Sequence, residues 1–184
     1  MGQQIVTIFG SSQPKEGDPD YVVAYDLGAA LARAGFAVCN GGYGGIMEAS
    51  ARGAKSGGGT TIGIIADFFP KKANAWIDTT LTARTLIERM QKLISQGDAY
   101  VILKGGTGTL LEFAAVWEFM NKNVMKEKPV VLVGHFWKRV LDTLREELEW
   151  EGLGDCTRYV TIVDSPAACA SFINQQLNGP NHGT

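Results

Sequence analysis

The chain has 184 residues and a formal net charge of −2, with 45% hydrophobic and 20% charged residues. This length is typical of one domain with a sizeable core, and the composition is ordinary for a globular protein. Because the charge is close to zero and no apolar run reaches the length of a membrane span, we expect neither nucleic acid nor a membrane as a partner. The beginning of the chain lacks a signal-peptide pattern, so the sequence predicts a cytoplasmic protein.

The three cysteines, Cys39, Cys156 and Cys169, are odd in number and widely spaced. This pattern is typical of buried, reduced thiols rather than of a disulfide framework. No pair of cysteine or histidine residues has the spacing of metal ligands, and no lysine is marked as a pyridoxal phosphate site. We therefore expect neither a metal nor a cofactor.

Apolar runs and amphipathic runs alternate along the chain. The runs predicted as strands are residues 5–9, 36–39, 60–65, 100–103, 129–133 and 160–163. The runs predicted as helices, several of which begin after a capping residue or a proline, are about 19–34, 46–56, 86–94, 109–123, 137–149 and 166–177. Residues 67–82 show no clear period, and an irregular connection of this length is usually functional or mobile. We expect one domain over residues 1–177 and a disordered tail over 178–184.

Strands that alternate with helices predict an α/β fold, in which a doubly wound, mostly parallel sheet has helices on both faces. Glycine-containing turns follow the predicted strands at Gly10-Ser11-Ser12, Gly41-Gly42-Tyr43-Gly44-Gly45 and Gly105-Gly106-Thr107-Gly108-Thr109. The last two also open helices, where bare backbone N–H groups meet the positive end of a helix dipole. Because ligands of such sheets bind beyond the carboxyl ends of the strands, we expect these turns to line one crevice and to hold a phosphorylated ligand.

Standard phosphate-binding motifs do not match these turns. A G-x-G-x-x-G fingerprint that began at Gly42 would need a glycine where Met47 stands, and no Gly-Lys-Ser/Thr sequence marks a P-loop. The turns therefore predict an anionic ligand, but they do not indicate which class of molecule it belongs to.

The stretch from Lys104 to Glu112, Lys-Gly-Gly-Thr-Gly-Thr-Leu-Leu-Glu, resembles the P-G-G-x-G-T-x-x-E signature of the LOG family. Characterised members of that family are cytokinin-activating phosphoribohydrolases. The turns at residues 9–12 and 41–47 and the Glu88-Arg89 pair resemble further family motifs in the same order. The resemblance implies a single Rossmann-like domain and a homodimer. It also implies hydrolysis of the N-glycosidic bond of a nucleoside 5′-monophosphate, AMP-like or with an N6-modified adenine, to the free base and ribose 5-phosphate.

The same resemblance makes Arg89 and Glu112 the catalytic pair. The residues that it assigns to phosphate or nucleotide binding are Gly10, Ser11, Ser12, Gly42, Gly44, Gly45, Met47, Gly105, Gly106, Thr107, Gly108 and Thr109. A carboxylate facing the ribose stabilises the oxocarbenium character of the transition state, and a guanidinium holds phosphate or ribose oxygens in a fork. We expect Glu112 in the first turn of its helix, where the dipole favours the ionised form and hence a role as base or electrostatic stabiliser.

Several of these residues also have purely structural interpretations. Thr109-x-x-Glu112 matches a capping box, in which both side chains satisfy backbone N–H groups at a helix start. A single arginine on an amphipathic helix, such as Arg89, is usually solvated. Trp76, in the irregular segment, is compatible with a lid, with stacking on a base or with simple packing.

Two departures from the family pattern keep a second function open. Lys104 stands at the signature's proline position, and Ala115 stands where many phosphoribohydrolases carry a second acidic residue. The stretch at residues 41–47 resembles a bacterial branch of the superfamily, and a relative of the same fold carries the molybdenum cofactor, which also ends in a phosphate. The alternative is therefore a non-catalytic binding or carrier protein for a phosphorylated cofactor or nucleotide.

Overall fold

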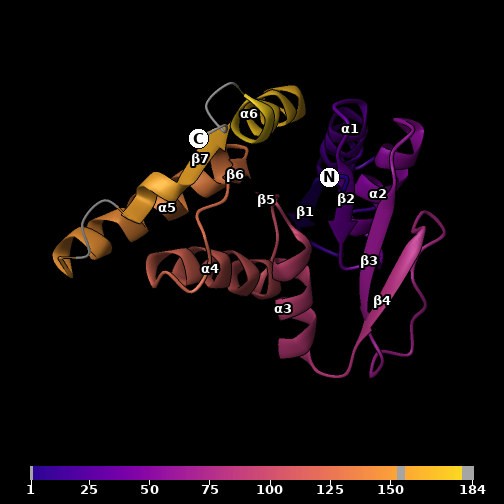
Figure 1. Cartoon of the computed structure of the whole chain (residues 1–184), viewed down its shortest axis with the longest axis horizontal. Coiled ribbons are helices and arrows are strands. Elements are labelled where there is room, and N and C mark those ends of the chain that lie inside the picture. Colours follow the sequence, from indigo (N-terminus) through magenta and orange to yellow (C-terminus); the bar gives the residue numbers. More distant parts are fainter. Residues whose placement is uncertain (1, 153–155, 180–184) are drawn as a thin grey trace.

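The computed structural model describes residues 2–152 and 156–179. Within them, seven strands form one sheet in which all neighbours run parallel, in the order β4-β3-β2-β1-β5-β6-β7 (Figure 1). The strands are β1 (Ile5–Phe9), β2 (Ala37–Asn40), β3 (Thr61–Ala66), β4 (Thr79–Ala83), β5 (Ala99–Ile102), β6 (Val130–Val133) and β7 (Val160–Val163).

The helices cover both faces of this sheet. They are α1 (Pro19–Arg33), α2 (Ile46–Ser56), α3 (Leu86–Gln96), α4 (Thr107–Asn121), α5 (His135–Trp150) and α6 (Pro166–Asn178), with a short 3₁₀ helix at Cys156–Tyr159. One hydrophobic cluster joins α1, α2 and α6 to the sheet, and a second cluster joins α3, α4 and α5 to it. The predicted α/β, doubly wound fold is therefore confirmed.

Strand side chains alternate between these two clusters, as the two-residue period of a strand requires. In β5, Val101 packs in the cluster of α1, α2 and α6, whereas Tyr100 and Ile102 pack in the cluster of α3, α4 and α5. All four residues of β6 are buried, because both faces of a central parallel strand are covered.

Close packing of α1 against α2 fixes the position of α2 at the sheet edge. A Cβ atom at Gly28 of α1 would lie 2.0 Å from the backbone oxygen of Ser50, and one at Gly53 of α2 would lie 1.9 Å from that of Tyr25. Only glycine allows the two backbones to come this near. The start of α2, which forms part of the site below, is therefore held firmly beside α1.

The expectation that residues 67–82 are irregular throughout is wrong, because β4 begins at Thr79. This edge strand pairs in parallel with β3, and no helix lies between the two. Of its five residues, only Ala83 is buried. The sequence did not predict β4 because its side chains are mostly exposed. An edge strand with polar side chains has no apolar run that would indicate a strand.

The helix ends also differ slightly from the expectations. α4 begins at Thr107, two residues earlier than expected, and α6 includes Asn178, so the first residue of the predicted tail is helical. Residues 180–184 of that tail lie outside the described part of the chain. At the start of α6, the Ser165 side chain caps the helix and accepts a hydrogen bond from Ala168 N at 3.2 Å.

Cys39 and Cys169 are buried free thiols, as expected, while the side chain of Cys156 lies outside the description. None of the described helices combines the length and the apolar character that a membrane crossing requires.

Candidate functional site

The order of the strands reverses at β1 and β5. From β1 the chain builds the sheet outward to β4, and it then returns to β5 on the other side and builds outward to β7. The turns that follow β1 and β5 lead to helices on opposite faces, which opens a crevice at the carboxyl edge of the sheet.

Backbone hydrogen bonds join the three glycine turns at this edge. Ser11 N donates to the carbonyl oxygen of Lys104 at 3.1 Å, and Ile46 N donates to the carbonyl oxygen of Ser11 at 2.9 Å. The turn after β1 is thereby tied to the turns after β2 and β5. The expectation that the three turns lie together is confirmed.

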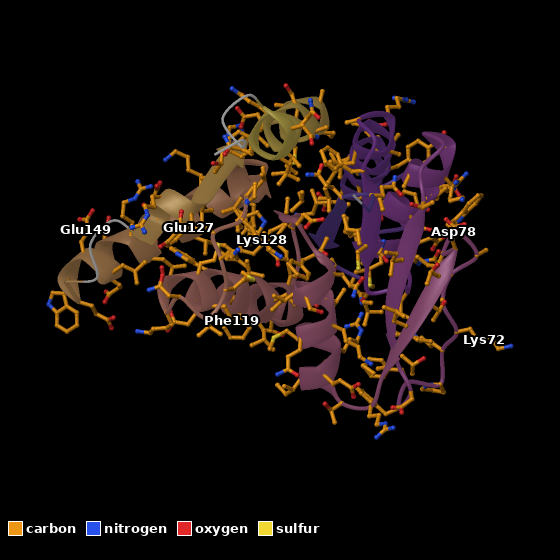
Figure 2. The ribbon with its side chains drawn as sticks, viewed as in Figure 1. Lys72, Asp78, Phe119, Glu127, Lys128 and Glu149 are labelled. Atoms are coloured by element: carbon orange, nitrogen blue, oxygen red, sulfur yellow. The ribbon has the colours of Figure 1, made fainter. Side chains whose placement is uncertain are left out.

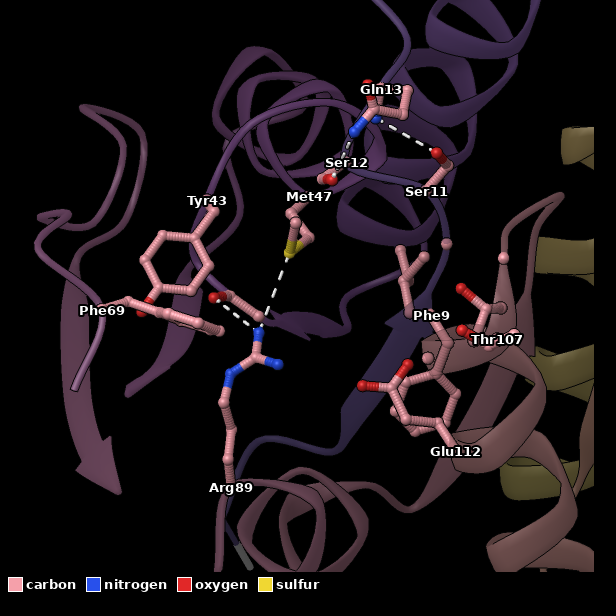
Figure 3. A pocket seen from close by; sticks show the side chains of 16 residues that line it. Phe9, Ser11, Ser12, Gln13, Tyr43, Met47, Phe69, Arg89, Thr107 and Glu112 are labelled. Atoms are coloured by element: carbon pink, nitrogen blue, oxygen red, sulfur yellow. Dashed lines mark hydrogen bonds between the residues drawn. The ribbon is translucent and has the colours of Figure 1, made fainter. Parts of the chain in front are cut away.

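A cavity of about 360 Å³ lies at this junction (Figure 3). It brings together ten of the residues predicted for the site: Gly10, Ser11, Ser12, Met47, Arg89, Gly106, Thr107, Gly108, Thr109 and Glu112.

Four predicted binding residues do not line this cavity: Gly42, Gly44, Gly45 and Gly105. Gly42 and Gly45 have φ angles of 75° and 68°, so these glycines shape the turn between β2 and α2. Gly44 and Gly45 line a neighbouring hollow, and Gly105 lines another. Gly42 and Gly45 thus shape a turn beside the cavity, and none of the four glycines lines the cavity itself.

The first turn of α4 presents unpaired backbone donors to the cavity. Its N-cap residue is Gly106, and no side chain caps the helix. The N–H groups of Thr107, Gly108 and Thr109 therefore have no partner within the helix, and they lie at the positive end of its dipole.

Two glycines of this turn are not required by the packing of the protein. A Cβ atom at Gly106 or Gly108 would meet no other part of the protein within 4 Å, and neither residue has a positive φ. At Gly105, by contrast, a Cβ atom would lie 2.2 Å from Oγ1 of Thr109. Gly105 thus serves the fold, whereas Gly106 and Gly108 leave open space in front of the helix start.

Arg89 is buried at the centre of the site, with only 9% of its surface exposed. Its Nε donates to the carbonyl oxygen of Ile64 at 2.7 Å, and its Nη2 donates to that of Gly41 at 3.0 Å. The guanidinium carbon lies 5.4 Å from the centre of the Tyr43 ring. Nη1, which has no hydrogen-bond partner among the described residues, points into the cavity toward Glu112 (Figure 3).

The burial of Arg89 rules out the solvated interpretation. A sequence signal for this burial existed, because Arg89 lies four residues before the buried Leu93 on the same helix face. Gly41, which sequence reasoning left out of the site, is needed for the same contact. A Cβ atom there would lie 1.9 Å from Nη2 of Arg89.

Glu112 lies on α4, across the cavity from Arg89 (Figure 3). Because α4 begins at Thr107, Glu112 lies in the second helical turn, and the expected position in the first turn is wrong. The capping box with Thr109 is not formed either, since the cap of α4 is Gly106 and receives no side-chain hydrogen bond.

The protonation of Glu112 also differs from the expectation. Burial raises the pKa of its carboxyl to about 7, and the positive charge of Arg89 opposes this shift only in part. Both protonation states are therefore populated near neutral pH. The helix dipole, which we expected to keep the carboxylate ionised, does not overcome the loss of water.

Sequence reasoning did not assign three aromatic residues of the cavity to the site, namely Phe9, Tyr43 and Phe69. Trp76, which it singled out, does not line the cavity but packs against Arg52, whose guanidinium carbon lies 5.6 Å from its ring centre. The connection from β3 to β4 explains this, because it leaves the carboxyl edge of the sheet and returns to the amino edge. Phe69 lies near its start and Trp76 near its end.

The two departures from the family signature lie outside the cavity. Lys104 is exposed, and its Nζ lies 3.6 Å from Oδ2 of Asp20. Ala115, one turn beyond Glu112, is partly buried against the hydrophobic cluster of α3, α4 and α5. In the described ranges, no group of three or more His, Cys, Asp or Glu side chains gathers in a way that would hold a metal ion.

Comparison with known proteins gives relatives of two kinds. The chain is 31% identical to the cytokinin riboside 5′-monophosphate phosphoribohydrolase of Mycobacterium tuberculosis over 143 residues, which cover 73% of this chain and 74% of that protein. It is also 31% identical to the protein of the same name from Rhodococcoides fascians over 163 residues, which cover 86% of this chain and 82% of that protein.

Among solved structures, the molybdenum cofactor binding protein from the phototrophic bacterium Rippkaea orientalis has the same fold, with a TM-score of 0.73 and 28% identity. This likeness covers 95% of the chain and 98% of that protein. The sequence model of the SLOG cluster4 family matches residues 3–157. These matches confirm the resemblance to the LOG family and to molybdenum cofactor carriers, and the chain belongs to the SLOG cluster4 family.

Proposed function

We propose that this protein hydrolyses the N-glycosidic bond of a nucleoside 5′-monophosphate and releases the free base and ribose 5-phosphate. One observation carries the proposal. The free Nη1 of Arg89 and the carboxyl group of Glu112 face the same cavity, beside a helix start with unpaired N–H groups. The names of the two phosphoribohydrolase relatives support the same reaction.

The phosphate of the substrate binds at the first turn of α4 in this proposal. The N–H groups of residues 107–109 supply hydrogen-bond donors there, and the open space before Gly106 and Gly108 admits the phosphate oxygens. The charge of Arg89 also favours an anion, because no carboxylate of the described chain lies within 4.0 Å of its guanidinium. A phosphate monoester therefore suits both features.

The ribose then lies between Arg89 and Glu112. As the bond to the base breaks, positive charge develops on the sugar, and an ionised Glu112 stabilises that charge and orients the attacking water. Nη1 of Arg89 donates to a ribose or phosphate oxygen and fixes the sugar in place. With a pKa of about 7, Glu112 is ionised in a large fraction of molecules at neutral pH.

A carrier function is the second candidate, and the likeness to the cofactor binding protein of Rippkaea orientalis favours it. The first turn of α4, with the N–H groups of residues 107–109, is called the phosphate cradle below. It would hold a phosphorylated cofactor or nucleotide without turnover. Ala115, at the position of a second acidic residue in many phosphoribohydrolases, fits this candidate. The two functions differ in the need for Glu112, which turnover requires and simple phosphate binding does not.

The assembly and the location of the protein belong to the same proposal. We propose a homodimer, because α3 and α4 expose large apolar side chains at Leu86, Ile87, Leu110 and Leu111. A cytoplasmic location stays a prediction.

The proposed reaction predicts that purified protein releases adenine and ribose 5-phosphate from AMP. Glu112→Gln is expected to lower kcat/KM by about 100-fold or more, because it removes the negative charge that faces the sugar. Glu118→Gln is the matched control, since Glu118 lies on the same helix but is exposed and pairs with Lys122. Chromatography of the released base measures both variants.

Failure to release a base from any purine or pyrimidine monophosphate would contradict the hydrolase. Retention of wild-type activity by Glu112→Gln would contradict the role of Glu112. Tight nucleotide binding without turnover, unchanged by Glu112→Gln, would favour the carrier.

The raised pKa of Glu112 predicts that Glu112→Gln stabilises the fold at alkaline pH. The folded protein binds this proton more tightly than the unfolded chain, so the stability that the neutral carboxyl contributes is complete below pH 4.5 and is lost as the pH rises to about 7. Glutamine does not titrate. The variant should therefore match the wild type near pH 4.5 and exceed it by roughly 1–3 kcal/mol at about pH 8. Urea unfolding at both pH values measures the difference, and an equal difference at both would contradict the shift.

The open space before α4 predicts that Gly108→Ala weakens phosphate binding without loss of stability. The new methyl group meets no other part of the protein within 4 Å, and alanine favours a helix over glycine by up to about 1 kcal/mol. It does occupy the space of the bound phosphate, so the Kd for ribose 5-phosphate should rise by about tenfold. Calorimetry measures this, with Gly2→Ala as a control at another unobstructed glycine. Unchanged affinity in Gly108→Ala would exclude the cradle.

A further inference from the structure

An aromatic wall, formed by Tyr43 and Phe69, closes one end of the cavity (Figure 3). The two rings lie in edge-to-face contact, with centres 5.8 Å apart and planes at 73°. Tyr43 follows β2 and Phe69 follows β3, whereas the first turn of α4 follows β5. The strand order β3-β2-β1-β5 therefore places the wall at one end of the cavity and the phosphate cradle at the other.

Hydrogen bonds fix both segments that carry the aromatic wall. The Tyr43 hydroxyl accepts a hydrogen bond from Ala66 N at 2.8 Å, which fixes the ring against the end of β3. Asn74 donates from its side chain to the carbonyl oxygens of Gly42 and Tyr43, at 3.1 and 2.8 Å. These bonds tie the segment after β3, which carries Phe69, to the turn that carries Tyr43. Figure 2 shows Lys72, which belongs to the same segment, at the edge of the molecule beside β4.

The two rings of the wall are not equivalent. The guanidinium of Arg89 lies over the Tyr43 ring, so that face is already engaged. Phe69 is 42% exposed and lines the cavity, although an aromatic side chain of this size is normally buried. Phe69 therefore offers apolar surface to a ligand, while Tyr43 supports Phe69 and positions Arg89.

Sheet geometry sets the size of the gap between the wall and the cradle. Neighbouring strands lie about 4.8 Å apart, so the turn after β2 and the turn after β5 are separated by roughly 10 Å. Arg89 and Glu112 face this interval. A phosphate, a sugar and a planar ring joined in that order would reach from the cradle to the wall.

We infer that Phe69 stacks on the base of the bound nucleotide and selects purines over pyrimidines. This inference rests on the proposed function for the orientation of the ligand, since it takes the phosphate to lie at α4. Stacking depends on the area of the ring that lies against the phenyl group, and a purine offers two fused rings. Ribose 5-phosphate, which has no base, makes no contact with Phe69.

Phe69→Ala tests the inference by calorimetry with three ligands: AMP, UMP and ribose 5-phosphate. We expect the Kd for AMP to rise by about tenfold, because stacking on an aromatic side chain contributes on this scale. The Kd for UMP should rise less, and that for ribose 5-phosphate should not change, which also shows that the variant is folded. Phe69→Tyr keeps a ring at this position and should bind AMP like the wild type.

Phe136→Ala is the matched control. Phe136, at the start of α5, is an exposed ring with 48% exposure, and it does not line the cavity. Its replacement should leave the affinity for AMP within about twofold of the wild type. A loss in Phe136→Ala as large as in Phe69→Ala would contradict the specific role of Phe69.

Binding and turnover separate this inference from the proposed function. If AMP binds through Phe69 but is not hydrolysed, the proposed hydrolysis is contradicted and the stacking role of Phe69 is supported. If AMP is hydrolysed and its affinity is unchanged in Phe69→Ala, only the stacking role of Phe69 is contradicted. Equal losses for AMP and ribose 5-phosphate, or no binding of AMP to the wild type, would also overturn it.

Discussion

The site depends on one buried cation that the protein holds with neutral groups. Arg89 has carbonyl oxygens and an aromatic ring as partners, and no described carboxylate approaches within 4.0 Å. Taking a charge out of water is costly unless it is paired or well hydrogen-bonded. Two of the three guanidinium nitrogens are satisfied in this way, and the third faces the cavity. In the proposed function, an anionic ligand completes this arrangement.

The same removal of water determines the state of Glu112. Its carboxyl group faces Arg89 across the cavity, yet burial outweighs that attraction and raises the pKa to about 7. The protein thus keeps an acid in an environment that disfavours its charge. A buried carboxyl group lowers the stability of the fold above neutral pH, and a residue with a purely structural role would not need one at this place. This cost is the physical argument for a chemical role of Glu112.

The sequence predicted the architecture well because the central strands are buried and the turns are rich in glycine. Apolar runs such as that of β6 indicate a parallel sheet, and in such a sheet the turns after the strands lie at one edge. The first residue of a helix is harder to predict from the sequence. α4 begins at Thr107 and its N-cap, Gly106, has no capping side chain, so capping rules favoured Thr109 and placed Glu112 in the wrong turn.

Contacts between segments that are distant in the sequence explain the other features that the sequence did not predict. Nothing in the local pattern of Gly41 shows that a guanidinium from α3 will lie against it. Phe69 and Trp76 are both aromatic residues in one irregular stretch, and only the path from β3 to β4 places the first at the cavity and the second at the far edge. β4 itself carries exposed threonines, which resemble a loop in sequence. These features follow from packing rather than from local preference.

The central claim is that a phosphate held at the start of α4 brings a sugar between Arg89 and Glu112. A crystal structure of Glu112→Gln with bound AMP tests it most directly, since the variant should retain the nucleotide without cleaving it. We predict the phosphate on the N–H groups of residues 107–109, the ribose beside Nη1 of Arg89 and the adenine against Phe69. A phosphate bound elsewhere, or a ribose remote from residues 89 and 112, would contradict the account.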